Sequence, residues 1–397
     1  MHSRHDLNLV LLLCMAEVLA MTGFATYPAL LTTLKISWNM TATEAGMVGG
    51  ALFFGYMVGV PFLSSITDRI DAKKVFAVSC LLSFAGAFGF GTWAHNVWEG
   101  MFWQAISGAG LAGTYMPGLK VLTDRISGPL QSRYVSFYTA TFGVGTSLSL
   151  LLSGWLIQVW SWPLVFQALS MAPIAAALMV WRLFEDCPPP SSAHTSSVQQ
   201  VRGVLAQSSI RAYILGYGVH CWELFGLRSW QVAFLTFAFG MGSSQAWVSP
   251  TEAAAFLNLL GLPASIIGNE WAMRTGRIKL ITWAMMASGV ISWLVAPSVA
   301  LPWMVILLVM SVYNIFVMAD SASLTAGLIS STPASSRGTA LAIYSFVGFG
   351  AGFVAPIAFG WVLDHSGGTS STWAWTLSMG LLGIGSLMMG LYMRMRA

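Results

Sequence analysis

Six charged or titratable side chains stand inside long apolar stretches of this sequence, where solvation by water does not explain them. They are Glu17, Lys120, His220, Glu223, Arg228 and Asp320. A charge at the centre of a bilayer costs about 2.5–3.5 kcal/mol by insertion scales, so such groups usually face a cavity or a partner. The chemistry that these residue types offer is reversible protonation of a carboxyl or imidazole, and binding of an anion by a guanidinium.

Two carboxylates occupy matching places in the first and second parts of the chain. Glu17 and Glu223 lie 206 residues apart. Each is about ten to twelve residues into its apolar run, which is close to mid-bilayer for a helix. His220 lies about 60° from Glu223 around a helix, close enough for a proton relay, and Asp320 is a further proton site. We therefore predict proton coupling at Glu17, Glu223, Asp320 and His220. The alternative is that the carboxylates are hydrogen-bonded to neighbouring helices and never titrate, and that His220 is a packing residue.

Arg228 is the fixed positive charge best placed to recognise a solute. A guanidinium stays protonated and can hold a carboxylate or phosphate through two parallel hydrogen bonds. On an ideal helix Arg228 lies about 140° from Glu223, so the two side chains do not share a face. The alternative is that Arg228 pairs with Asp320 or Glu17 inside the protein. Lys120, four residues before Asp124, is expected to extend toward the membrane surface instead.

Polar and aromatic side chains inside the apolar runs supply the other candidates for substrate binding. Such side chains either line a cavity or pack between helices, and packing is the commoner role of an aromatic residue. With Arg228, the predicted substrate-binding residues are Tyr115, Trp222, Trp230, Asn314, Gln104, Tyr138 and Tyr344.

The elements that must position these residues are membrane helices. Hydrophobic residues make up 56% of the chain and charged residues 8%, against about 25% charged in a soluble domain. Backbone groups in lipid must be hydrogen-bonded within their own segment, so the spans are helices, and the short alternating segments of a β-barrel are absent. We predict an all-α membrane protein with twelve spans, at 7–31, 44–66, 74–94, 98–121, 133–159, 163–182, 211–238, 252–272, 279–297, 302–328, 338–362 and 372–393.

One polar stretch divides the spans into six and six. Residues 184–209 contain a proline triplet and several serines, which is typical of a linker. The predicted domains are therefore an N-terminal bundle at 1–182, a cytoplasmic linker at 183–210 and a C-terminal bundle at 211–397. Of the 18 Lys and Arg residues, 15 fall in the linker, the C-terminus and the other segments on its side of the membrane. The positive-inside rule then places both termini in the cytoplasm, with a bacterial inner membrane as the expected location.

The two halves also share loop sequences. Arg69 and Arg274 lie in charged loops 205 residues apart, and the pattern P-x-x-S-R recurs at 129–133 and 333–337, 204 residues apart. Because six spans separate the copies, the halves run in the same direction through the membrane. A parallel repeat of this kind predicts a binding site between the halves near the bilayer midplane.

These features resemble the major facilitator superfamily along the whole chain. The family's first charged loop reads roughly G-x-x-x-D-R-x-G-R-K, and here Asp68, Arg69, Lys73 and Lys74 match, whereas Ser64 and Asp71 replace the glycines. The resemblance implies two six-helix pseudo-repeat bundles and a charge clasp that locks one conformation. The clasp residues implied are Asp68, Arg69, Lys73, Arg133, Arg274 and Arg337. The alternative is that these are loop charges that set topology alone.

Two further family elements are altered in this chain. The fourth span of the family often carries R-x-x-Q-G-x-G, and here Gln104 takes the place of the arginine while Gly108 and Gly110 match. The fifth span of drug–proton antiporters carries G-x-x-x-G-P-x-x-G-G, and here Ser149 and Leu150 replace the central Gly-Pro pair. The altered exporter element favours import over export.

The sequence therefore predicts a proton-coupled secondary active transporter of a small polar or anionic solute, working by alternating access as a symporter. The alternatives are a drug or metabolite exporter that exchanges its solute for protons, and a receptor or assembly factor that keeps the fold without transport. No nucleotide-binding loop, nucleophile–base spacing or metal-ligand spacing of the four cysteines occurs, so we expect no enzyme activity, metal or cofactor. The expected partners are a small-molecule substrate, protons and the lipid bilayer, with no nucleic acid, and the chain is expected to be a monomer.

Overall fold

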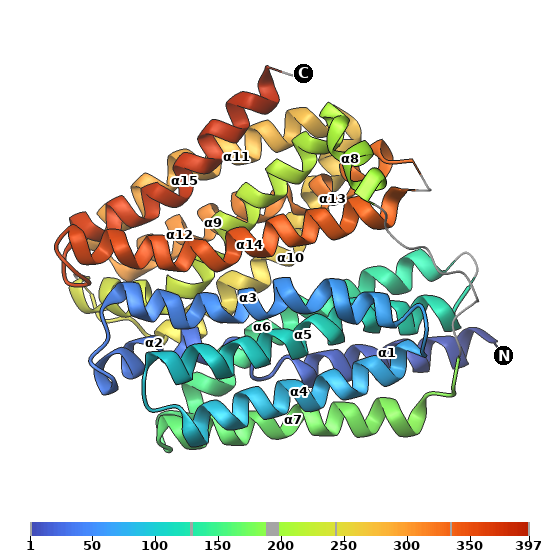
Figure 1. Cartoon of the computed structure of the whole chain (residues 1–397). Coiled ribbons are helices and arrows are strands. Elements are labelled where there is room, and N and C mark those ends of the chain that lie inside the picture. The colour runs from blue at the N-terminus through green and yellow to red at the C-terminus, as the bar shows by residue number, and fades with distance from the viewer. Residues whose placement is uncertain (1, 128–129, 188–197, 243, 334–335, 396–397) are drawn as a thin grey trace. The chain divides into compact units, whose positions relative to one another are not determined.

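The described part of the chain is built from helices alone (Figure 1). The computed structural model describes all residues except 1, 128–129, 188–197, 243, 334–335 and 396–397. The helices are α1 (His2–Ala20), α2 (Thr26–Ser37), α3 (Ala42–Ile66), α4 (Ala72–Trp93), α5 (Val97–Arg125), α6 (Gln131–Leu156), α7 (Trp162–Leu183), α8 (Val198–Ala206), α9 (Ser208–Met241), α10 (Pro250–Thr275), α11 (Arg277–Val295), α12 (Trp303–Ala319), α13 (Ser321–Ser331), α14 (Arg337–His365) and α15 (Thr372–Arg394), with a 3-10 helix, η1 (Ala296–Ala300). The predicted all-helical membrane fold is confirmed.

Nine helical segments among the described residues are long and apolar enough to cross a membrane. They coincide with nine of the twelve predicted spans, and the pair α12–α13 counts as one of them. The other three predicted spans, 7–31, 98–121 and 211–238, are the ones that contain Glu17, Lys120, Glu223 and Arg228. Those segments are helical too, but their polar residues or helix breaks separate them from the purely apolar ones.

The chain divides into two compact units, which we describe separately. Unit 1 comprises Met1–Leu30 and Ala51–His194, and unit 2 comprises Leu31–Gly50 and Thr195–Ala397. The predicted bundle boundaries at 182 and 211 stay a prediction. Pro129 of the first P-x-x-S-R copy, residues 334–335 of the second and residues 188–197 of the linker lie outside the described residues.

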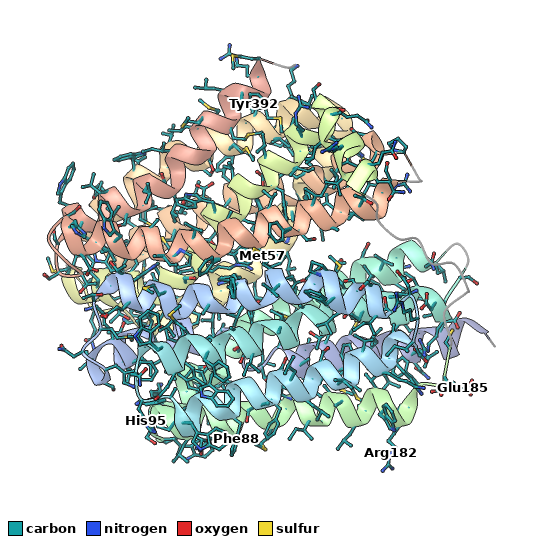
Figure 2. The ribbon with its side chains drawn as sticks, viewed as in Figure 1. Met57, Phe88, His95, Arg182, Glu185 and Tyr392 are labelled. Atoms are coloured by element: carbon teal, nitrogen blue, oxygen red, sulfur yellow. The ribbon has the colours of Figure 1, made fainter. Side chains whose placement is uncertain are left out.

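Unit 1 is centred on α4, which packs between α5 and α7 (Figure 1). Figure 2 shows Phe88 and His95 at one end of this unit and Arg182 and Glu185 at the opposite end. The helices approach closely where one of them has a glycine. A Cβ atom built on Gly108 of α5 would collide with the Leu52 carbonyl oxygen of α3. Small residues of this kind are what allow close helix contact in lipid, where apolar burial contributes little.

Replacing Gly108 by valine is expected to lower the free energy of unfolding of unit 1 by about 1–3 kcal/mol, because α3 and α5 must separate to admit the side chain. The measurement is the thermal melting temperature of the purified protein in detergent. Gly240→Val is the matched control, since a Cβ on Gly240 meets no atom within 4 Å. Equal melting temperatures for the two variants would contradict the close contact.

Unit 2 is built around α9, which packs against α14 and α15, while α11 also packs on α15. The start of α3 belongs to this unit and is capped by a carboxylate of α14. Asp364 accepts hydrogen bonds from the backbone nitrogen atoms of Ala42 (2.8 Å) and Thr43 (2.7 Å) and from the Thr43 hydroxyl (2.6 Å). A carboxylate at a helix N-terminus satisfies free N–H groups and complements the helix dipole.

Two of the predicted spans are broken helices, and both breaks adjoin a candidate proton site. The first span divides into α1 and α2 around residues 21–25, shortly after Glu17. The backbone nitrogen of Ala25 donates to the Ser149 hydroxyl of α6 (2.9 Å), and the Ser153 hydroxyl donates to Thr26 (3.1 Å). Ser149, which takes the place of a glycine in the exporter element, thus accepts a hydrogen bond from a backbone N–H group at the break. The other break separates α12 from α13 at Asp320.

Candidate functional site

The break between α12 and α13 brings Asp320 against a histidine of α9. The His220 Nδ1 atom lies 2.8 Å from Asp320 Oδ1, and each residue is 3% exposed. The Tyr217 ring stacks on the His220 ring with centroids 5.9 Å apart, and on the Tyr344 ring at 3.7 Å. Tyr344 in turn shares a hydrogen bond with Thr325 of α13 (2.9 Å). Two of the predicted proton-coupling residues are therefore in contact, inside a stack of aromatic rings.

Glu223, one turn beyond His220 on α9, has a different set of partners. Its carboxylate accepts hydrogen bonds from the hydroxyls of Ser288 on α11 (2.9 Å), Tyr313 on α12 (3.0 Å) and Ser386 on α15 (2.5 Å). Three donors satisfy most of the acceptor capacity of a buried carboxylate. Glu223 is thus hydrogen-bonded to neighbouring helices, and its contacts join α9 to α11, α12 and α15.

Glu17 is less well satisfied than Glu223. Its side chain is fully buried, and Oε2 accepts one hydrogen bond from the Tyr138 hydroxyl of α6 (3.1 Å). The other oxygen, Oε1, is buried with no hydrogen-bond partner among the described residues. The Tyr115 ring of α5 stacks on Tyr138 with centroids 6.0 Å apart. The two carboxylates at matching sequence positions thus have unlike surroundings.

Arg228 belongs to a polar row that runs between α9 and α12. Arg228 and Gln231 are three residues apart on α9, and therefore on one face. On α12, Nη2 of Arg228 contacts the Met318 sulfur at 4.0 Å, and Gln231 donates to Asn314 (3.5 Å). Asn258 of α10 donates to Gln231 (2.9 Å) and extends the row. Sequence reasoning missed Gln231 and Asn258, although their polar side chains inside apolar runs were the available signal.

The remaining aromatic candidates pack inside their units. The Trp230 ring packs against Phe359 and Trp375, and its indole N–H donates to the Pro356 carbonyl oxygen (3.0 Å). Contacts within the protein therefore account for both the ring and the N–H group of Trp230. Gln104 is buried on α5, and Trp222 is half-buried on α9.

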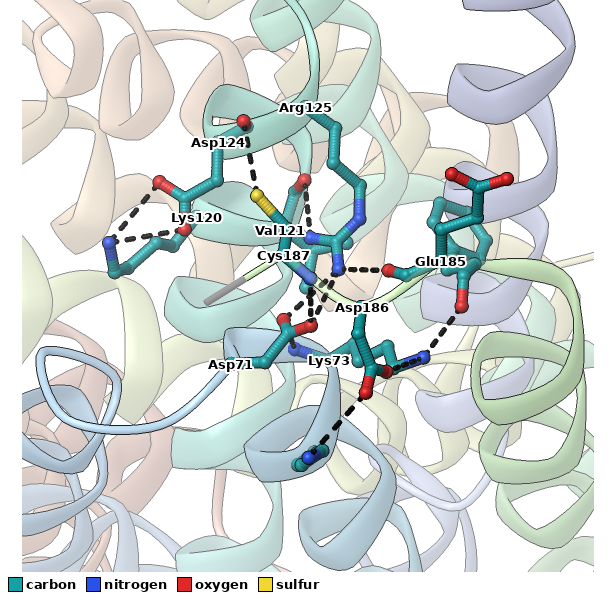
Figure 3. Close-up of polar contacts among 11 residues, drawn as sticks. Asp71, Lys73, Lys120, Val121, Asp124, Arg125, Glu185, Asp186 and Cys187 are labelled. Atoms are coloured by element: carbon teal, nitrogen blue, oxygen red, sulfur yellow. Dashed lines mark hydrogen bonds and ion pairs between the residues drawn. The ribbon is translucent and has the colours of Figure 1, made fainter. Parts of the chain in front are cut away.

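A second polar cluster lies at the end of unit 1 where α4 begins (Figure 3). We call Asp71, Lys73, Arg125, Asp186 and Cys187 the Asp71 cluster. Asp71 caps α4 by accepting from the Lys73 backbone nitrogen (2.9 Å), and Arg125 Nη2 contacts both of its carboxylate oxygens (2.9 and 3.1 Å). The Cys187 backbone nitrogen also donates to Asp71 (2.7 Å). One buried carboxylate therefore holds α4, α5 and the chain that leaves α7.

Lysine side chains complete the Asp71 cluster. The Lys73 ammonium donates to the Phe184 carbonyl oxygen (2.7 Å) and forms an ion pair with Asp186, and Lys74 lies 3.8 Å from the same carboxylate. The Lys73 hydrogen bond lowers the pKa of Asp186, which is exposed to solvent. Its small screened contribution to stability is present above the ordinary pKa of an aspartate and is lost as the pH falls through the lowered value.

Of the predicted clasp residues, the structure places Lys73 in this cluster. The others are exposed in a turn or near a helix end: Asp68, Arg69, Arg133, Arg274 and Arg337. Sequence reasoning missed Asp71 and Arg125. Asp71 directly precedes an apolar run, and the preference for aspartate at helix N-caps was the signal that could have found it.

Replacing Asp71 by alanine is expected to speed maleimide labelling of Cys187 roughly tenfold or more, because a hydrogen bond to a charged group contributes about 1.5–3 kcal/mol. The labelling rate is measured with Cys14, Cys80 and Cys221 replaced by alanine. Lys120→Ala is the matched control, since it removes the Lys120–Asp124 side-chain pair (3.2 Å) and leaves in place the Asp124 backbone carbonyl that the Cys187 thiol contacts at 3.6 Å. A wild-type rate in the Asp71 variant would show that the carboxylate does not hold this segment.

These sites define a multi-pass helical membrane protein with buried ionisable groups on broken or polar helices. Within the described residues, no group of three or more His, Cys, Asp or Glu is arranged to hold a metal ion. The sequence profile of the Major Facilitator Superfamily matches residues 13–356, and the chain belongs to this family. The family implies a small-molecule substrate and a membrane setting.

Named relatives and solved structures are consistent with that membership. The niacin transporter NiaP of Acinetobacter baylyi is 24% identical over 159 residues, which are 40% of this chain and 36% of that protein. The chain thus matches little more than a third of the length of this curated relative. A solved bacterial homologue of the human lysosomal transporter Spinster has a TM-score of 0.75 at 15% identity over 98% of this chain and 96% of that chain. The nucleoside transporter NupG has a TM-score of 0.75 at 14% identity, over 97% and 99%. At these identities the structures show the fold alone.

Proposed function

We propose that the protein is a proton-coupled secondary active transporter that moves a small polar or anionic solute by alternating access, as a symporter. The observation that carries the proposal is the buried His220–Asp320 pair at the α12–α13 break. Ionisable side chains inside a membrane are costly and usually mark a functional site, and histidine and carboxylate groups are the ones that proton relays use. The helix is broken at Asp320 itself, so a change in the charge of this side chain acts directly on the backbone that joins α12 to α13.

The anionic character of the solute is inferred from Arg228. The guanidinium lies on the same helix as His220, at the end of a row of side-chain amides that offer further hydrogen bonds. Guanidinium and amide groups together suit a small carboxylate that also carries a hydrogen-bonding group. The niacin transporter among the relatives supports the choice of niacin, a small organic acid, as the first probe.

The membrane setting of the proposal follows the distribution of Lys and Arg. We propose that the N-terminus, the linker and the C-terminus lie in the cytoplasm of a bacterial cell, with the protein in the inner membrane as a monomer.

The test is uptake into proteoliposomes that carry an imposed pH gradient. Niacin, other small carboxylates, nucleosides and amino acids are supplied outside while the inside is alkaline, and accumulation is compared with liposomes lacking the gradient. Accumulation that the gradient drives, and that an uncoupler abolishes, supports symport. Accumulation only when the gradient is reversed identifies an exporter, and the absence of any gradient-dependent flux of these solutes favours the receptor or assembly factor.

A further inference from the structure

The Tyr138 hydroxyl lies within hydrogen-bond distance of three acceptors, more than its one hydrogen can reach at a time. It lies 3.1 Å from Glu17 Oε2 on α1, 3.2 Å from the Thr114 carbonyl oxygen and 3.1 Å from the Tyr115 carbonyl oxygen, both on α5. A phenol carries a single hydrogen, so it can donate fully to one of these acceptors at a time. The side chain is fully buried, and water does not complete the set from solvent.

A proline and a glycine of α5 lie next to the carbonyl groups that the Tyr138 hydroxyl contacts. Pro117 lies inside α5 and has no backbone N–H, so it cannot donate to the carbonyl oxygen of Gly113, the residue before Thr114. A Cβ on Gly118 would collide with the Tyr138 hydroxyl oxygen, so glycine at this position leaves the space that the phenol occupies. The absence of a side chain at Gly118 therefore lets the Tyr138 hydroxyl of α6 reach the Thr114 and Tyr115 carbonyl oxygens of α5.

The surroundings of Glu17 leave it dependent on that hydroxyl. The titratable side chains that act on Glu17 are Cys14 on α1, Cys80 on α4, Tyr115 on α5 and Tyr138 on α6. All four are neutral when protonated, and none of them supplies a positive charge. Helix α7 packs on α1 with the apolar residues Ala176, Ala177 and Val180. Within the described part of the chain, an ionised Glu17 thus has the Tyr138 O–H as its one donor, whereas Oε1 has none.

We propose that Tyr138 is a positioning residue that transmits the protonation state of Glu17 to α5. With Glu17 ionised, the Tyr138 O–H donates to the carboxylate and joins α6 to α1. When a proton from bulk water binds a Glu17 oxygen, the new carboxyl O–H donates to the Tyr138 oxygen, and the phenol turns its own hydrogen to the Thr114 or Tyr115 carbonyl. The hydroxyl keeps its hydrogen throughout, and its donated bond moves from α1 to α5. This step rests on the proposed proton coupling and assigns it a site in unit 1.

The test is infrared difference spectroscopy of the reconstituted full-length protein across a pH titration, with ring-deuterated tyrosine to identify tyrosine bands. In the wild type, a carboxylic-acid C=O band and a tyrosine C–O band are expected to titrate together. Glu17→Gln should remove both changes, and Tyr138→Phe should remove the tyrosine change and shift the C=O band. Should Tyr138→Phe fail to fold, the comparison of wild type with Glu17→Gln still decides the question.

Tyr313→Phe is the matched control, because Glu223 keeps two other hydroxyl donors when that phenol is lost. It should leave both titrating bands unchanged. A tyrosine change that survives in Glu17→Gln, a Glu17 C=O band that is the same in Tyr138→Phe as in the wild type, or the absence of any Glu17 band would overturn the proposal. The spectra need neither substrate nor flux, so a failure of the transport experiment and a failure of this one are separate results.

Discussion

Asp320→Asn is expected to abolish accumulation of solute driven by a pH gradient while leaving exchange of solute across the membrane. Asparagine keeps the size of the side chain at the α12–α13 break but cannot bind and release a proton in the physiological range. The neighbouring His220, 2.8 Å away in the wild type, then loses its carboxylate partner. The gradient-driven accumulation ratio should fall at least about tenfold, the factor that corresponds to 1.4 kcal/mol.

Accumulation and solute counterflow are measured on the same proteoliposomes, so that a folding defect, which lowers both, is recognised. Asp124→Asn serves as the control, because that carboxylate pairs with Lys120 near the end of α5 and lies outside the proposed proton site. His220→Gln should resemble Asp320→Asn. Unimpaired uphill uptake by Asp320→Asn would remove this pair from the coupling mechanism.

Arg228→Lys is expected to raise the half-saturating concentration of an anionic solute roughly tenfold to a hundredfold. Lysine keeps the positive charge but cannot make two parallel hydrogen bonds to a carboxylate, and a hydrogen bond to a charged group contributes about 1.5–3 kcal/mol. The measurement is competition of niacin and other carboxylates against the transported probe. A neutral solute should be affected much less than the carboxylates.

Arg133→Lys is the matched control for charge and size, since Arg133 is exposed and lies over the Phe137 ring. Its substitution should leave the half-saturating concentration unchanged. If Arg228→Lys behaves in the same way, Arg228 has a structural role and the solute's charge is read elsewhere.

Hydropathy was enough to predict the helices but not where they break. The runs of apolar residues that predict spans also mark the limits of most helices, because a lipid-exposed backbone has one way to satisfy its hydrogen bonds. The breaks at residues 21–25 and Asp320 were not predicted, since side chains of other helices, such as Ser149 against Ala25, stabilise them. Such partners are distant in sequence and leave no local pattern.

For the candidate site, too, the sequence did not predict contacts with side chains of other helices. The spacing of Glu17 and Glu223 correctly indicated two buried carboxylates, and the repeat suggested that they are equivalent. Their hydrogen-bond partners do not repeat, however: the position 206 residues before Ser386 is occupied by Val180, which has no hydroxyl. A repeat of backbone segments therefore does not ensure a repeat of the chemistry around them.

The serine contacts at the α1–α2 break also bear on the mechanics of unit 1. In the exporter element that the fifth span resembles, a glycine–proline pair would make that span pliable, whereas α6 here runs unbroken from Gln131 to Leu156 with no proline. The interruption lies instead in the first span, where Ser149 and Ser153 hydrogen-bond to Ala25 and Thr26 at the start of α2. Of these two spans, the interrupted one is therefore the span that carries Glu17, and its two parts can change their angle while α6 stays one continuous helix.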